Sequence, residues 1–172
     1  GCSDDTTIII TVYPNPTAII NPVSPVCQGD STVFTENSIQ GGNAPLTIYQ
    51  WNMGGAGTYV NGTNSTSQNP EYEYDNCDIY TVTLTVTDSN GCTHDTTIHV
   101  TVHCPPLVDF SSSIVCDGDS TVFTDLSDVD TLIASGHSIV NWSWSFGSVF
   151  ANDSFNFDTC GIDVLNITLT VI

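Results

Sequence analysis

The sequence predicts an all-β protein from three observations: short stretches alternate apolar and polar residues, glycine-containing turn signals separate them, and no stretch shows helical periodicity. The clearest alternation is TVTLTVT (81–87), where the valines and the leucine share one face of a strand and the threonines take the other. The same pattern recurs in residues 98–102 and 167–171. Half-buried antiparallel strands with threonine facing water are therefore expected.

An internal repeat divides the sequence into units of about 90 residues. VCQGDSTVFTENS (26–38) recurs as VCDGDSTVFTDLS (115–127) with 10 of 13 positions identical, and GCSDDTTIIITV (1–12) recurs as GCTHDTTIHVTV (91–102) with 8 of 12 identical. Each unit has about seven short strands and one tryptophan expected in the core, Trp51 or Trp144. This pattern predicts two tandem immunoglobulin-like β-sandwiches.

The repeat also indicates that one strand is displaced. Residues 91–102 follow residues 80–90 as the second half of a hairpin, whereas residues 1–12 carry the second half alone and 165–172 the first half alone. We expect residues 1–12 to be the last strand of a preceding or neighbouring domain, 13–103 the first sandwich, and 104–172 a second, incomplete sandwich. A neighbouring repeat or subunit would supply the missing strand, and the apolar residues of this junction are Ile8, Ile10, Val12, Ile167, Leu169 and Val171.

Charge and cysteine content restrict the partners and the compartment. The chain has 19 acidic residues and no Lys or Arg, so its net charge of −19 excludes nucleic acid and anionic membranes as partners. No apolar run is long enough to insert into a membrane. Seven cysteines without a C-x-x-C spacing favour oxidised, structural cysteines, and hence a secreted protein at the cell surface or outside the cell.

Two motifs then resemble a known family. W-x-(M/F)-G occurs at 51–54 and 144–147, and YTVTLTVTDSNGC follows the first at 80–92. These resemble the PKD (polycystic kidney disease) domain, and in particular the PKD-like repeats of Bacteroidetes surface proteins such as gliding-motility adhesins and other type IX secretion cargo. The resemblance implies an extracellular array of binding or spacer modules. The family's W-x-F-G-D-G is here WNMGGAG and WSFGSVF, so the role of its loop aspartate is not carried over.

The cysteines are expected to form structural pairs. In an immunoglobulin-like sandwich the second and sixth strands start at the same end of facing sheets, which predicts the disulfides Cys27–Cys77 and Cys116–Cys160. The alternative is four free buried thiols. A junction disulfide between Cys2 of one copy and Cys104 of the next is a further hypothesis, and Cys92 has no obvious partner.

Two kinds of site are weighed on the expected surface. DLSDVD (125–130) offers carboxylates for Ca²⁺ at Asp125, Asp128 and Asp130, although a solvated acidic loop is the favoured interpretation and no cofactor is required. Asp-(Ser/Thr)-(Thr/Leu) triplets resemble the O-glycosylation motif of Bacteroidetes secreted proteins, and their central hydroxyls are Thr6, Ser31, Thr96, Ser120 and Thr131.

These observations favour a structural component, repeat or subunit, of an extracellular bacterial filament, stalk or adhesin. Its partners are copies of itself or neighbouring repeats, joined head to tail by strand complementation or as a long tandem array. The alternative is a carbohydrate-binding or spacer module of a secreted hydrolase, in which exposed aromatics such as Tyr49 and Trp142 would contact extracellular glycans. We do not expect an enzyme, because no nucleophile lies in a recognisable elbow and no basic residue could hold an oxyanion.

Overall fold

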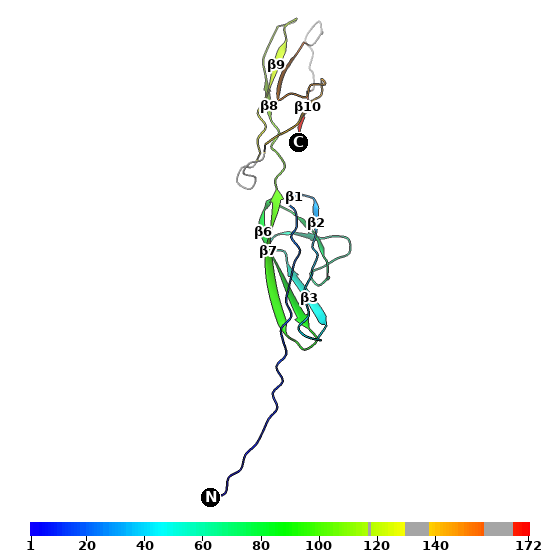
Figure 1. Ribbon diagram of the computed structural model, residues 1–172. Helices are drawn as coiled ribbons and strands as arrows, with labels where there is room; N and C mark the ends of the chain where they lie inside the picture. The colour runs from blue at the N-terminus through cyan, green and yellow to red at the C-terminus, as the bar shows by residue number, and fades with distance from the viewer. Residues whose placement is uncertain (117, 130–137, 157–166) are drawn as a thin grey trace. The chain divides into compact units, whose positions relative to one another are not determined.

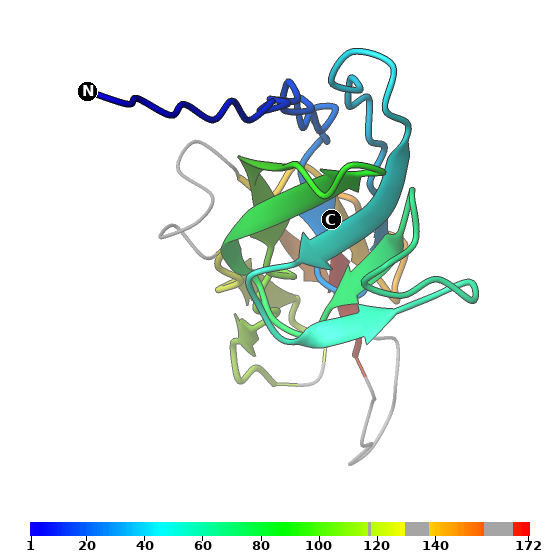
Figure 2. The same cartoon turned by 90° about the horizontal axis from the view of Figure 1, so that it is seen from below.

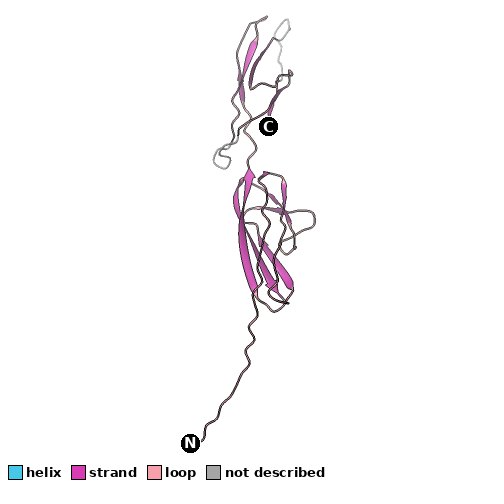
Figure 3. Cartoon of the chain, in the orientation of Figure 1, coloured by secondary structure: helices cyan, strands magenta, loops and turns pink. Residues whose placement is uncertain are grey.

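The computed structural model describes residues 1–116, 118–129, 138–156 and 167–172. These residues form strands and loops and no helix, as Figure 3 shows by its colours, so the all-β prediction is confirmed. It follows that the described residues include no helix long and apolar enough to cross a membrane. The chain divides into two compact units, Gly1–Val102 and His103–Ile172.

The first unit is a β-sandwich of two sheets. One sheet has the order β1 (Val26–Cys27), β7 (Thr93–His103), β6 (Asp78–Asp88) and β3 (Leu46–Asn52), and the other has β2 (Ser31–Val33), β5 (Glu71–Tyr74) and β4 (Gly57–Tyr59). The neighbouring strands β3, β6 and β7 are antiparallel, and Leu84 of β6 lies opposite Trp51 of β3. Figure 2 looks along this unit and shows the two sheets facing each other.

The core of the first unit follows from the alternation in β6 and β7. Val82, Leu84 and Val86 are fully buried, while the intervening threonines are exposed or half-buried, because successive side chains of a strand point to opposite faces. The ring of Trp51 packs on Phe34 with centroids 5.7 Å apart. Its indole N–H donates to the carbonyl of Ser67 at 2.9 Å, so the buried polar atom is satisfied.

A row of tyrosines closes one part of this core. Tyr59, Tyr72, Tyr74 and Tyr80 contact in sequence, and the rings of Tyr74 and Tyr80 stack with centroids 4.2 Å apart. Tyr74 is 1 % exposed, and its hydroxyl donates to the carbonyl of Met53 at 3.1 Å. Burial strongly raises the pKa of this phenol, which therefore remains a protonated donor.

The second unit contains two smaller sheets. One has the order β11 (Asn152–Phe155), β9 (Thr121–Asp125) and β8 (Phe110–Ser112), and the other pairs β10 (Trp142–Trp144) with β12 (Leu169–Val171). Its core brings together Phe123, Trp144, Leu169 and Val171. The indole N–H of Trp144 donates to the carbonyl of Phe150 at 2.8 Å, as that of Trp51 does to Ser67 in the first unit.

The repeat seen in the sequence reappears in the strand register. Trp144 lies opposite Leu169 as Trp51 lies opposite Leu84, and Trp142 lies opposite Val171 as Tyr49 lies opposite Val86. The pair β10–β12 is therefore the counterpart of β3–β6.

Candidate functional site

The N-terminal segment, residues 1–12, is an extended stretch with apolar side chains in solvent. Ile8, Ile10 and Val12 are 76 %, 75 % and 86 % exposed, and Ile9 is 94 % exposed. The segment belongs to no strand, and Figure 1 shows it running away from the sandwich of the first unit. Four such exposed apolar side chains within five positions are unfavourable in water unless another surface covers them.

The edge of β12 is the second part of the site. β12 pairs with β10 on one side, and among the residues that the structure describes no strand pairs with its other side. Its inward side chains Leu169 and Val171 are 7 % and 8 % exposed, and Ile167 just before it is half-buried. An unpaired edge with apolar neighbours is a template for another strand. The structure thus describes residues of both predicted halves of the junction, the exposed apolar segment 1–12 and the edge of β12.

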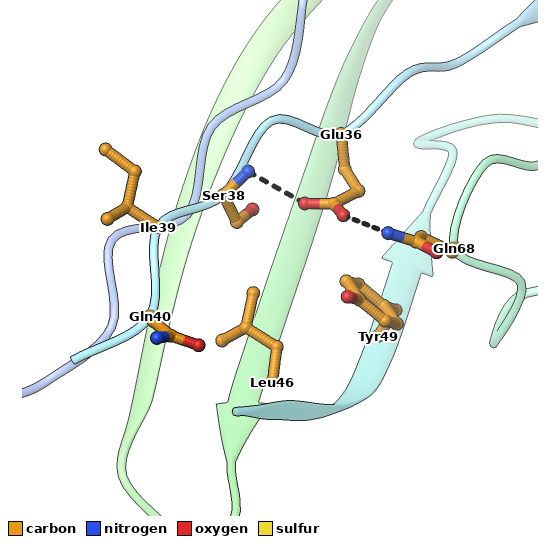
Figure 4. A pocket seen from close by; sticks show the side chains of 7 residues that line it. All are labelled: Glu36, Ser38, Ile39, Gln40, Leu46, Tyr49 and Gln68. Carbon is orange, nitrogen blue, oxygen red and sulfur yellow. Dashed lines mark hydrogen bonds between the residues drawn. The ribbon is translucent and has the colours of Figure 1, made fainter. Parts of the chain in front are cut away.

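A shallow groove of about 440 Å³ lies on the first unit, lined by Leu46 and Tyr49 of β3 together with residues from the loops around Glu36 and Gln68 (Figure 4). The carboxylate of Glu36, which is 9 % exposed, accepts from the Ser38 backbone N–H at 2.8 Å and from the Gln68 amide at 2.6 Å. Burial raises the pKa of the Tyr49 phenol, and the neighbouring Glu36 carboxylate raises it further.

The second unit repeats this acid–aromatic pair. Asp125 stands where the repeat has Glu36, and Trp142 stands where it has Tyr49. The indole N–H of Trp142 donates to the Asp125 carboxylate at 2.7 Å, and the Ser127 backbone N–H donates to the same carboxylate at 2.9 Å. In the second unit the pair joins the last residue of β9 to β10 of the other sheet, and in the first unit it joins Glu36, which follows β2, to β3 of the other sheet. The aligned repeats ENS (36–38) and DLS (125–127) carried this signal, but sequence reasoning did not use it.

This pairing bears on the predicted calcium site. Burial alone would raise the pKa of the Asp125 carboxyl, but hydrogen bonds from Ser127 and Trp142 outweigh it and hold the pKa below its usual value. Asp128 is exposed and accepts from the Val129 backbone N–H, whereas Asp130 lies outside the described residues. No cluster of three metal-ligating side chains occurs within the described part of the chain. Calcium at this loop stays a prediction.

The predicted disulfide pairs are wrong where the structure describes them. Cys77 and Cys104 are disulfide-bonded, whereas Cys27 and Cys116 are free and exposed. The Cys27–Cys77 prediction placed the two residues on facing sheets, but β1 and β6 belong to one sheet and β7 lies between them. Two strand spacings are about 9–10 Å, which is too far for a disulfide.

The other two predicted disulfides also disagree with the state of the cysteines in the structure. Cys116 is free, so it does not pair with Cys160, which lies outside the described residues. Cys2 is free and Cys104 is already disulfide-bonded, so the predicted junction bond Cys2–Cys104 has no available thiol at its second position. Cys92, for which no partner was expected, is free and half-buried.

The hydroxyls of the predicted O-glycosylation triplets differ in accessibility. Thr6, Ser31 and Ser120 are exposed, Thr96 is half-buried on β7, and Thr131 lies outside the described residues. The Ser31 hydroxyl donates to Glu71. Thr6 and Ser120 are therefore the two accessible hydroxyls for which the structure shows no competing side-chain bond within its described part.

The model of the PKD domain family matches residues 13–102, just over half of the chain. This chain belongs to the PKD domain family. The match covers the first sandwich, including its W-x-M-G motif and the strands β6 and β7. The PKD loop aspartate is replaced by Gly55 here, and a Cβ at Gly55 would overlap the ring of Tyr80, so the stacked tyrosines occupy the space that a side chain would need.

Solved structures show similar PKD and β-sandwich modules. The PKD1 domain of Vibrio anguillarum Epp is 29 % identical, with 55 % of this chain and all of that chain covered and a TM-score of 0.44. The PKD domain from KIAA 1837 protein is 18 % identical, with 60 % and 93 % covered and a TM-score of 0.39. A structure described as a promiscuous carbohydrate-binding module of the β-sandwich superfamily is 17 % identical, with 92 % and 85 % covered and a TM-score of 0.46. No curated protein sequence matches the chain.

Membership of the PKD family and the disulfide-bonded cysteines both indicate an extracellular location. PKD and immunoglobulin-like domains are typically extracellular, and disulfides persist in oxidising compartments. The chain is therefore an extracellular module of the structural or binding kind.

Proposed function

We propose that this PKD-family chain is a structural component of an extracellular bacterial filament, stalk or adhesin, which joins copies of itself or neighbouring repeats head to tail. One observation carries the proposal: the exposed segment 1–12 repeats the sequence of β7, the strand that completes the sheet in the first unit. A strand offered by one copy and an open edge on the next form a heterologous contact, which does not close on itself and propagates as a filament.

The surface chemistry supports an architectural role. The polar surface consists of hydroxyls, amides and carboxylates without a basic residue, so it attracts cations and repels nucleic acid and anionic membranes. No predicted nucleophile, acid–base pair or cofactor is needed for such a role, and we propose a non-catalytic protein. The finer resemblance to Bacteroidetes surface repeats and type IX secretion cargo is part of this proposal.

The direct test compares the intact chain with a variant lacking residues 1–12. Sedimentation velocity over a range of concentrations should show head-to-tail oligomers of the intact chain, and electron micrographs of concentrated samples should show filaments. The truncated variant should stay monomeric with an unchanged circular dichroism spectrum, because the deleted segment contributes nothing to the core. A monomeric intact chain at every concentration would contradict assembly by strand complementation.

Glycosylation is a separate proposal for the exposed triplets. If Thr6, Ser31 or Ser120 carries a glycan, the intact mass of protein secreted by its native host exceeds that of the bare polypeptide. Peptide mapping would locate the glycan. An intact mass equal to that of the bare polypeptide would contradict the glycosylation proposal.

The alternative function is a carbohydrate-binding or spacer module of a secreted hydrolase, and the groove beside Tyr49 favours it. The groove combines an aromatic ring with amide and carboxylate groups, as neutral sugars require. The repeated acid–aromatic pair argues for a structural role of the same residues. Glycan-array binding by the monomer that is lost in Tyr49→Ala, with the fold retained, would favour this alternative.

A further inference from the structure

The position that a joining strand would take on the second unit can be read from the first. β12 is the counterpart of β6, because the cross-strand pair Trp144 and Leu169 repeats the pair Trp51 and Leu84. On its other side, β6 is paired along its whole length with β7, and Leu84 lies opposite Thr96 there. The corresponding side of β12 has no strand among the described residues.

The inward side chains of β6 are more completely buried than those of β12, which agrees with the strand that pairs with β6 on this side. Val82, Leu84 and Val86 of β6 are 0 % exposed. Their counterparts Leu169 and Val171 keep 7 % and 8 % exposure, and Ile167 is only half-buried. Among the described residues of the second unit, no strand gives β12 the apolar cover that β7 gives β6 through Ile98, Val100 and Val102.

Residues 1–12 repeat the sequence of residues 91–102, which contain most of β7, the strand that covers β6. Ile98, Val100 and Val102 correspond to Ile8, Ile10 and Val12 at a constant offset of 90. We propose, resting on the head-to-tail assembly above, that this segment of a second copy adds antiparallel to β12 in the β6–β7 register. Transferring the pairs Val82–Ile98, Leu84–Thr96 and Val86–His94 places Ile167 opposite Ile8, Leu169 opposite Thr6, and Val171 opposite Asp4.

The register assigns a face to every residue of the segment. Ile8, Ile10 and Val12 point into the recipient sandwich, because a strand alternates its faces and their counterparts on β7 point inward. Ile9 corresponds to His99, which is exposed on β7, and therefore points to solvent in the assembly. A slip of one residue would exchange the two faces. Ile9, the most exposed isoleucine of the segment, is thus the one that the assembly does not need.

A second copy is the occupant that the internal repeat favours. In the first unit β7 already fills the corresponding position, so that unit offers no vacancy beside β6. A second copy brings a segment with the right alternation, and main-chain pairing with β12 supplies the remaining affinity. Association with a second copy depends on protein concentration, whereas folding back onto the same chain does not.

The experiment compares Ile8→Asp with Ile9→Asp in the full chain by sedimentation equilibrium. Both side chains are exposed in the monomer, so neither change affects its fold, which circular dichroism verifies. Ile8→Asp should weaken association by about 30-fold or more, because a buried isoleucine becomes a buried carboxylate. Ile9→Asp should change it by less than about threefold, as expected for a solvent-facing position. Equal loss in both variants, or a greater loss in Ile9→Asp, would overturn the register while leaving the assembly itself in place.

Cysteine trapping fixes the register independently. In a background where Cys2, Cys27, Cys92 and Cys116 are changed to serine, Thr7→Cys and Thr168→Cys are introduced in separate chains, which are then mixed. These positions correspond to the opposed pair Thr97 and Thr83 of the first unit. The expected result is a disulfide-linked dimer whose bridged peptide is identified by mass spectrometry. The matched control, Thr7→Cys with Thr170→Cys, is displaced by two residues and should cross-link much less.

The outcomes separate the two proposals. Efficient trapping of the control pair instead would show another register. Concentration-independent trapping within one chain carrying both changes, with no dimer, would show that the occupant is not a second copy. A wild-type chain that never associates would contradict the proposed function itself.

Discussion

Backbone conformation at single glycines explains part of the family motif. Gly54 in W-x-M-G has a φ of 76°, and a Cβ there would overlap the carbonyl oxygen of Thr81 on β6. The motif therefore needs glycine for two reasons, the left-handed conformation and the close approach of a neighbouring strand. Gly62 in the Asn61–Gly62 turn has a nearly identical φ of 75° but has no atom within 4 Å of its Cβ position.

This contrast yields a stability prediction. Gly62→Ala should lower the free energy of unfolding by about 1 kcal/mol, because it incurs only the cost of the left-handed conformation. Gly54→Ala should lower it by about 1–3 kcal/mol more, since backbone and strand must also move apart. Urea unfolding monitored by tryptophan fluorescence measures both. Similar values for the two variants would contradict the crowding argument.

The acid–aromatic pairs link elements of different sheets. Asp125 ends β9, Trp142 begins β10, and a hydrogen bond of 2.7 Å joins them. The first unit has Glu36 beside the Tyr49 phenol at the corresponding place. Two sheets of a sandwich usually meet through apolar side chains, so a polar contact repeated in both units specifies how the sheets are aligned.

The Asp125 pair predicts a pH dependence in the second unit. The pKa of this carboxyl is lowered in the folded state, so its contribution to stability is complete above the unfolded value of 3.8 and is lost as the pH falls through the lower, folded value. The indole N–H resonance of Trp142 should therefore shift as the pH is lowered below 3.8. In Asp125→Asn the shift should disappear, whereas in Asp128→Asn it should persist. A shift unaffected by Asp125→Asn would mean that another group causes it.

The strands β6 and β7 are flanked by the disulfide-bonded cysteines. Cys77 directly precedes β6 and Cys104 directly follows β7, whereas the free Cys27 lies on β1. Cys77→Ser should lower the melting temperature clearly, because loss of a native disulfide costs about 2–5 kcal/mol in a small extracellular domain.

The matched control is Cys27→Ser, which removes an exposed free thiol and should leave the melting temperature nearly unchanged. Reduction of the wild type with dithiothreitol should reproduce the Cys77→Ser value. If Cys27→Ser were as destabilising as Cys77→Ser, the sequence-based pairing Cys27–Cys77 would be correct after all.

At the scale of the whole molecule, charge opposes assembly. A net charge of −19 makes two copies repel each other, and the Debye length shortens from about 30 Å at 0.01 M salt to about 8 Å at 0.15 M. Head-to-tail association should therefore strengthen as NaCl rises over this range, in contrast to contacts between opposite charges. Sedimentation velocity at both salt concentrations tests this. Association that weakens with salt would contradict an apolar, strand-based junction.

The sequence alone determined the fold class and the alternation that produces it. The alternation of apolar and polar residues in 81–87 and 98–102 is a local pattern, and a strand with one buried face requires it. The family followed from the same residues and is confirmed for residues 13–102. Internal repetition also indicated the hairpin of residues 80–102, which the structure shows as the antiparallel pair β6 and β7.

Only the tertiary structure decided which strands share a sheet. Val26–Cys27 joins the sheet of β6 with β7 between them, and this placement excludes the Cys27–Cys77 bond. The contact of Asp125 with Trp142 likewise depends on two sheets meeting at a particular offset. Such contacts join residues that are distant along the chain, so no local pattern encodes them. Sequence periodicity specifies the faces of a strand, and packing of the whole unit decides what each face meets.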